Sequence, residues 1–369
     1  MEPLIEKNQE ISHELNCKDC GAVLHFSPGT QNLSCQYCGA QNEIPKLSSE
    51  VEEIDFNEFL KDKAGKEEKQ TVTVVKCNNC GASTTLQPNI ISDTCPFCAS
   101  PVVVKDGTTS TIIKPKYVLP FKIDDKTAHD TYEKWLGKLW FAPNDLKKTA
   151  SLSERLKGIY MPYWTYDANT VCQYVGQRGD YYYTTERQLV VINSKKQWSD
   201  KQVRHTRWTF KSGTVENKFD DVCVLASKTL PDETTRNLEP WDVKNFAAFD
   251  EGYLSGFQTE CYQVEVQQGF ETAKNVMDQQ IRATVCRDIG GDEQRVNQLN
   301  TDYSNVTFKH VLLPIWISAY RYKEKPYRFI INGRTGKLQG QRPYSAAKIV
   351  LAVLTALLVI FLIYLVTQS

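Results

Sequence analysis

The sequence predicts an α+β protein built from two small four-cysteine zinc ribbons, a mostly antiparallel, β-rich α+β domain and one C-terminal transmembrane helix. Three observations predict this: a duplicated cysteine pattern near the N-terminus, long runs of β-branched and aromatic residues in the middle, and one uncharged apolar stretch near the end. The 369 residues include 44 Lys+Arg and 44 Asp+Glu, so the net charge is zero, which disfavours a strongly basic nucleic-acid binder. The 41% of hydrophobic residues is enough for a folded core.

The N-terminal part of the chain contains the pattern C-x2-C-x14-C-x2-C twice, sixty residues apart. The cysteines concerned are Cys17, Cys20, Cys35 and Cys38 in the first copy and Cys77, Cys80, Cys95 and Cys98 in the second. The repeat extends to the residue between the last two cysteines, where Tyr37 matches Phe97. We therefore predict one unit in two copies, ribbon 1 at residues 1–46 and ribbon 2 at residues 71–105.

This spacing is typical of a structural metal site. Two residues between paired cysteines allow a tight turn to aim both sulfurs at one point, and Gly21 and Gly81 suit such turns because glycine accepts a positive φ. Two turns joined by a hairpin complete a closed, tetrahedral four-thiolate site, so we expect Zn²⁺ in both units and no catalysis there. Zinc contributes on the order of 10–16 kcal/mol to small zinc peptides, so both units should unfold without it.

Zinc has two alternatives. A rubredoxin-like iron site has the same four-sulfur ligand set and stays open. Disulfide bonds are disfavoured because the N-terminus, MEPLIEKNQE, lacks the pattern of a signal peptide.

The charges around the ribbons favour protein partners over nucleic acid. Residues 1–46 carry six acidic residues against three lysines, and residues 71–105 carry only Lys76, Lys105 and Asp93. Neither copy has the row of Lys and Arg that neutralises phosphates.

Residues 47–70 are rich in Glu, Asp and Lys, and we expect a charged linker with a short helix, acting as a solvated tether. The α+β domain is expected at residues 116–345, where runs of β-branched and aromatic residues predict strands. Apolar residues at helical spacing predict two helices, one through Ala128, Tyr132, Trp135 and Leu139 and one through Phe270, Ala273, Met277 and Ile281.

Later parts of this domain also carry local signals. Val306–Tyr322 and Tyr327–Ile331 are expected to be strands, with a hairpin turn at Asn332-Gly333. Arg178, in the sequence Gly176–Asp180, is expected to lie in a turn between strands.

No catalytic constellation is visible, and we predict that the protein is not an enzyme. Gly336-Lys337 is followed by Leu338, so it is not a phosphate-binding loop, and neither G-x-S-x-G nor H-E-x-x-H occurs. His205 and His310 are expected to have structural or surface roles. The remaining cysteines, Cys172, Cys223, Cys261 and Cys286, are expected to be free, with a third metal site as the alternative.

The run from Ile349 to Val366 is uncharged and mostly apolar, and as a helix it reaches ~27 Å, close to the thickness of a bilayer core. We predict a single-pass transmembrane helix at 349–366. Lys337, Arg342 and Lys348 precede it and no positive charge follows, so the positive-inside rule puts the bulk of the chain in the cytoplasm, on the inner membrane. Ala352 and Ala356 form one small-xxx-small pair, so homo-oligomerisation stays open.

Four segments carry a family resemblance. They are VKCNNCGA…CPFC in ribbon 2, KPKYVLPFKID at Lys114–Asp124, GIYMPYWTYDA at Gly158–Ala168 and INGRTGKLQGQRPYS at Ile331–Ser345. With these, nearly the whole chain resembles bacterial membrane-anchored zinc-ribbon proteins of the TFIIB-type zinc-ribbon-containing family, also described as primosomal helicase-like. The resemblance implies the same eight cysteine ligands. It also implies association with flotillin-like (SPFH) proteins and with membrane-stress factors like phage-shock protein A.

The expected function is therefore that of a tail-anchored adaptor or scaffold at the cytoplasmic face of the membrane, whose zinc ribbons recruit protein partners. The first alternative is a membrane-tethered regulator that binds nucleic acid through its ribbons. The second is a switch that responds to oxidants or to zinc availability.

Overall fold

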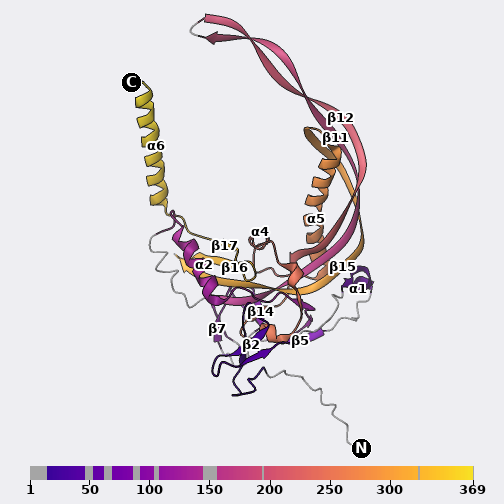
Figure 1. Ribbon diagram of the computed structural model, residues 1–369, viewed down its shortest axis with the longest axis vertical. Helices are drawn as coiled ribbons and strands as arrows, with labels where there is room; N and C mark the ends of the chain where they lie inside the picture. Colours follow the sequence, from indigo (N-terminus) through magenta and orange to yellow (C-terminus); the bar gives the residue numbers. More distant parts are fainter. Residues whose placement is uncertain are drawn as a thin grey trace, which may run out of the picture.

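The protein is built around one large, mostly antiparallel sheet (Figure 1). The computed structural model describes residues 15–45, 53–61, 69–85, 92–103, 108–143, 156–192, 195–322 and 325–368. At the centre of the sheet, β11 (Lys157–Ile192) pairs antiparallel with β15 (Glu293–Tyr322). Parallel pairs join β10 (Tyr117–Val118) to β15 and β14 (Gln258–Glu260) to β11. The α+β class predicted from the sequence is confirmed.

The apolar run at the start of β11 is continuous because both faces of the strand are buried. Ile159 and Met161 point into a core shared with ribbon 2, whereas Trp164 and Tyr166 lie in a second core. Tyr160 belongs to a third core, shared with ribbon 1. A strand covered on both sides has no polar alternation, which explains the sequence IYMPYWTY.

Both predicted helices are present, although the first ends at Gly137, so predicted Leu139 lies just beyond it. Helix α2 (Asp125–Gly137) begins after Asp124, whose carboxylate accepts a hydrogen bond of 2.8 Å from the backbone N–H of Thr127. Helix α5 (Val266–Ile289) packs against β11, β12 and β15 through an apolar stripe. That stripe consists of Val266, Phe270, Ala273, Met277, Ile281, Val285 and Ile289, all buried.

A long hairpin of β11 and β12 (Lys195–Leu225) rises from the sheet as a curved arm (Figure 1). β15 covers β11 only as far as the pair Gly179↔Glu293, so the outer part, which we call the arm (residues 180–192 and 195–207), has two strands. The predicted turn around Arg178 is wrong, because this residue lies within β11. The glycines near Arg178 allow close packing of neighbouring side chains and do not mark a turn. A Cβ at Gly176 would lie 2.8 Å from Ile289, and one at Gly179 would lie 2.9 Å from Trp208.

The two ribbons pack directly on this domain. Ribbon 1 is a separate three-stranded sheet of β1 (Leu24–Phe26), β2 (Asn32–Cys35) and β3 (Gln41–Glu43). Ribbon 2 includes β5 (Lys69–Lys76), β6 (Ser83–Thr85), β7 (Ser92–Thr94) and β8 (Pro101–Val103). β6 pairs with β14, and β9 (Thr108–Ile113) pairs with β5, so ribbon 2 is continuous with the large sheet.

The described part of the segment between the ribbons is not a solvated tether. The expected short helix corresponds to α1 (Phe56–Lys61), which follows β4 (Ile54–Asp55). β4 pairs with β15, and buried Phe56 lies against Phe270 at a ring distance of 4.6 Å. The many charged residues of this segment predicted a solvated linker, whereas burial of Phe56 holds the described part against the large domain.

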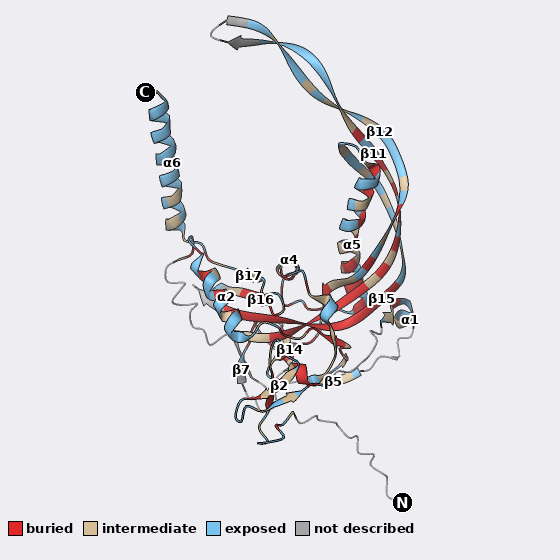
Figure 2. Cartoon of the chain, viewed as in Figure 1, coloured by how far each residue is buried: buried red, intermediate tan, exposed pale blue. Residues whose placement is uncertain are grey.

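The chain ends with a hairpin and a helix. β16 (Lys325–Asn332) pairs with β17 (Leu338–Gly340), as the turn signal predicted, and Gly336 has the positive φ of +75°. Helix α6 (Ala346–Gln368) stands apart from the domain, and its surface is almost wholly exposed (Figure 2). Smaller elements are α4 (Asp232–Arg236), η3 (Val243–Asn245), β13 (Ala247–Ala248) and η4 (Glu251–Leu254).

Candidate metal centres

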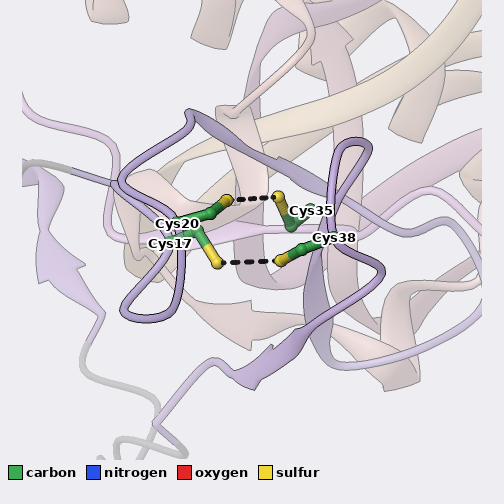
Figure 3. A group of neighbouring side chains, drawn as sticks. All are labelled: Cys17, Cys20, Cys35 and Cys38. Atoms are coloured by element: carbon green, nitrogen blue, oxygen red, sulfur yellow. Dashed lines mark hydrogen bonds between the residues drawn. The ribbon is translucent and has the colours of Figure 1, made fainter.

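Each ribbon gathers its four predicted cysteines into one cluster. In ribbon 1, Cys17 and Cys20 face Cys35 and Cys38 across the gap between two loops (Figure 3). The Sγ atoms of Cys17 and Cys38 lie 3.5 Å apart, as do those of Cys20 and Cys35. In ribbon 2, the Sγ distances for Cys77–Cys98 and Cys80–Cys95 are both 3.6 Å.

These distances fit a tetrahedral metal site. Within each cluster all four sulfurs lie within 4.8 Å of one another. A tetrahedron with metal–sulfur bonds of about 2.3 Å has its sulfurs about 3.8 Å apart, whereas a disulfide bond measures about 2.05 Å. The clusters therefore match a four-cysteine metal site, and all eight cysteines are free thiols in the structure.

Backbone geometry shapes each cysteine pair in the same way. The N–H of the residue after the second cysteine donates to the carbonyl of the first, as from Gly21 to Cys17 at 2.8 Å and from Gly81 to Cys77 at 2.9 Å. That residue has a positive φ in every pair: +73° at Gly21, +78° at Gly39, +76° at Gly81 and +56° at Ala99. The turns predicted at Gly21 and Gly81 are confirmed. In the fourth pair the residue with positive φ is an alanine, Ala99, instead of a glycine.

The electrostatics of the clusters favour a bound cation. Backbone N–H groups of Cys38 and Tyr37 lower the pKa of Cys35 to about 6. A hydrogen bond from Cys95 lowers the pKa of Cys80 to about 5, and the resulting thiolate raises the pKa of Cys95. One thiolate thus forms readily in each site, but four adjacent negative charges require a cation between them.

The two copies differ in the burial of the turn between their third and fourth cysteines. Phe97 of ribbon 2 is fully buried, at 0% exposure, in the core that also holds Met161 and Leu313. Tyr37 of ribbon 1, the matching residue, is 86% exposed. Ribbon 2 is thus built into the domain, whereas ribbon 1 presents an aromatic ring to solvent. The sequence shows the match between the two residues but not this difference in burial.

Ribbon 1 still has a firm attachment. The ring of Phe26 lies 5.3 Å from that of Tyr253, and the Phe26 N–H donates to the Ser255 carbonyl at 3.0 Å. A further bond of 2.8 Å joins the Gly29 N–H to the Phe121 carbonyl. The inner side of the ribbon is therefore fixed, which leaves the turn at Tyr37 facing outward.

The other cysteines and histidines do not join these clusters. Among the described residues, the groups suited to a metal are the two cysteine clusters. Cys172 and Cys261 are buried, and burial raises the pKa of Cys261 to about 12. His310 is buried with Nδ1 2.9 Å from the Ile113 carbonyl oxygen, whereas His205 lies on the arm, where its ring stacks on Tyr182.

An ion cluster around buried Lys309 lies outside the metal centres. The ammonium of Lys309 lies 3.0 Å from Glu53 and 2.7 Å from Asp221. This contact ties residue 53 to β15, so we assign it to holding the segment before α1 in place. A single sequence offers no signal for such a pairing between residues so far apart in the chain.

The segments that carry the family resemblance form the structural core. Lys114–Asp124 contains β10 and buried Phe121, and Gly158–Ala168 forms the first part of β11. In Ile331–Ser345, buried Asn332 donates to the Leu238 carbonyl at 3.0 Å and accepts a bond from the Arg334 N–H. These segments thus shape the fold around the metal centres.

Helix α6 is long and apolar enough to cross a membrane. Within its span of Ala346–Thr367, a stretch of 18 residues has a mean hydropathy of 3.2, and none of that stretch is buried in the protein. The predicted run 349–366 lies within it.

Comparison with known proteins gives one extended similarity. The chain is 26% identical over 342 residues to "Uncharacterized protein YdjG" of Bacillus subtilis (strain 168), covering 90% of this chain and 91% of the other. No protein-family model and no solved structure matches the chain. The similarity extends well beyond the ribbons, so it involves the large domain as well.

Proposed function

We propose that the protein is a zinc-dependent adaptor, without catalytic activity, that is anchored to the inner membrane by α6. The folded part lies on the cytoplasmic side, and ribbon 1 recruits a protein partner. Proteins like flotillin and like phage-shock protein A, which the family resemblance implies, are the first partners to test.

Zinc is proposed for both centres because four thiolates in a closed tetrahedron leave no position for a substrate or water. Iron in the same ligands is the alternative, and elemental analysis with the absorption spectrum of the purified protein distinguishes the two. The cytoplasmic side is proposed because Lys337, Arg342 and Lys348 precede the span. A reducing compartment also keeps metal-bound thiolates from oxidation.

The exposed ring of Tyr37 is the observation that carries the adaptor proposal. A large aromatic side chain at 86% exposure on a fixed turn is typical of the anchor residues that contribute most to protein interfaces. The metal centre holds the turn rigid, which lowers the entropic cost of binding. Half-exposed Val23 of the same ribbon adds apolar surface.

The test is affinity purification of the tagged, full-length protein from detergent-solubilised membranes of its own host. Tyr37→Ala is expected to lose the partner while keeping its metal and its thermal stability. Trp198→Ala is the matched control, since Trp198 is an aromatic residue on the arm with 69% exposure. Equal recovery of the partner with Tyr37→Ala would count against ribbon 1 as the recognition surface.

The arm favours a second candidate function, that of a membrane-tethered nucleic-acid binder. The arm carries six Lys and Arg residues against three acidic residues, and it exposes Tyr183 and Trp198. Arg204 lies 4.3 Å from the ring of Tyr181. Basic strands with exposed aromatic rings suit single-stranded nucleic acid. Retention of RNA that falls steeply with salt and is lost in Trp198→Ala would support this function over the adaptor.

A further inference from the structure

A groove of about 900 Å³ lies between the C-terminal end of α2 and the first turns of α6. One wall contains Leu139, Trp140 and Phe141, and the other contains Leu351, Ala352 and Thr355 of α6. The wall residues are mostly apolar, and Lys348 adds one charge.

Hydrogen bonds hold the two walls together. The Ser345 N–H donates to the Phe141 carbonyl at 2.7 Å. The Lys348 ammonium donates to the carbonyls of Trp140 and Ala142 at 3.1 and 2.7 Å. An ammonium has three N–H donors, and the described residues accept from two of them, which leaves the third for an acceptor at the groove.

The position of the groove places it where the bilayer begins. Leu351, Ala352 and Thr355 belong to the apolar span, while Lys348 and Tyr344 lie at or before its start. Trp140 is 78% exposed beside this start, and Tyr344 is also exposed. Exposed Trp and Tyr rings next to an apolar span are typical of the membrane interface, where an indole is stable between water and lipid.

We propose that this groove binds one anionic phospholipid, with an acyl chain along Leu351 and Ala352 and the phosphate at Lys348. This inference rests on the proposed anchoring of α6 in the membrane. Lipid is the apolar molecule present at that depth, and the groove is continuous with the surface of α6 that must face lipid. The described residues that line the groove include Lys348 and no acidic residue, which favours a negatively charged headgroup.

The test uses the full-length protein reconstituted in nanodiscs of equimolar phosphatidylglycerol and phosphatidylcholine, then released into mild detergent for native mass spectrometry. Ala352→Phe fills the groove, and Val353→Phe makes the same kind of change at an exposed position of α6 that does not line it. Wild type and Val353→Phe are expected to retain one phosphatidylglycerol per chain. Ala352→Phe is expected to retain about tenfold less, which corresponds to ~1.4 kcal/mol.

Equal lipid retention by Ala352→Phe and wild type would overturn the groove as the binding site, and equal retention of phosphatidylcholine would overturn the anionic headgroup. Washing the host membranes with carbonate tests the membrane anchoring by α6 separately from the lipid site. Wild type and both variants are expected to stay in the washed membranes. Release of the wild-type protein would instead contradict the membrane anchoring on which the inference rests.

Discussion

At the scale of single residues, the position after each second cysteine decides how well a metal centre folds. Glycine occupies this position in three pairs, and Ala99 occupies it in the fourth at a φ of +56°. A left-handed conformation costs an alanine roughly 1–2 kcal/mol. The second pair of ribbon 2 therefore carries backbone strain that the other pairs avoid.

Ala99→Gly is expected to stabilise ribbon 2 by about 1 kcal/mol, because the strain removed exceeds the entropy that glycine adds to the unfolded chain. Gly81→Ala, at the matching position of the first pair, is expected to destabilise it by a similar amount. Release of metal to a chelator under increasing denaturant measures both effects. A lower midpoint for Ala99→Gly than for wild type would contradict the strain at this residue.

Buried His310 makes stability depend on pH. Burial lowers the pKa of His310 to about 4, below the ordinary value of 6.5, so the unfolded chain binds a proton that the folded chain rejects between these values. Stability should thus fall as pH falls through this range, by about 2 kcal/mol from pH 7 to pH 5. His310→Asn, which keeps an N–H donor for Ile113, is expected to lose this part of the dependence.

Chemical denaturation in detergent, followed by tryptophan fluorescence at both pH values, measures the His310 effect. Protonation of metal ligands acts on both proteins alike, so the difference between wild type and His310→Asn isolates the histidine. An identical pH dependence in the two proteins would contradict this assignment.

At the scale of elements, the sequence pattern predicted the features whose signal lies within one short stretch of the chain. The two four-cysteine clusters followed from cysteine spacing, and α2 and α5 followed from apolar residues at helical spacing, because each signal lies within one short segment. The long apolar helix α6 followed from its uncharged run for the same reason.

The arm and the packing of the ribbons on the large domain could not be predicted from local sequence patterns. Gly176 and Gly179 suggest a turn locally, and only the neighbouring Ile289 and Trp208 show that they serve close packing within a strand. Likewise, Tyr37 and Phe97 are matched in the repeat, and only the tertiary contacts of ribbon 2 bury one of them. Contacts between distant segments decide these features.

The arm is expected to be dispensable for folding, because its residues beyond Gly179 lack a third strand and are mostly exposed. Replacing residues 183–204 with Asn-Gly joins the paired residues Tyr182 and His205 by a two-residue hairpin turn. The shortened protein is expected to keep both metal ions and to melt within about 2 °C of wild type.

Gly176→Val is the contrasting variant, since a side chain there collides with Ile289. It is expected to destabilise the domain by about 1–3 kcal/mol. Thermal melting compares the two variants. Loss of cooperative melting in the shortened protein would contradict the division between arm and domain.

At the scale of the whole molecule, the arm and α6 rise on the same side of the domain (Figure 1). The arm carries charged residues, and its two strands have open backbone edges, so it cannot enter the hydrocarbon around α6. α6 is held at its base by Lys348 and Ser345. In the proposed membrane-anchored state we therefore expect the arm to lie outside the hydrocarbon of the bilayer.

The two copies of the four-cysteine unit differ in their role within the molecule. Ribbon 2 completes the domain, since β5 and β6 join the large sheet and Phe97 is buried in the core. Ribbon 1 packs on the domain through Phe26 but turns Tyr37 outward. Removing one metal centre at a time should therefore have unequal effects.

The most direct test compares Cys35→Ser/Cys38→Ser with Cys95→Ser/Cys98→Ser in the full-length protein, by metal content, thermal melting and partner recovery from membranes. The first variant is expected to keep one zinc ion and cooperative melting of the domain but to lose the partner. The second is expected to lose cooperative melting altogether. Equal loss of folding in both variants, or recovery of the partner without the ribbon 1 metal centre, would contradict the account.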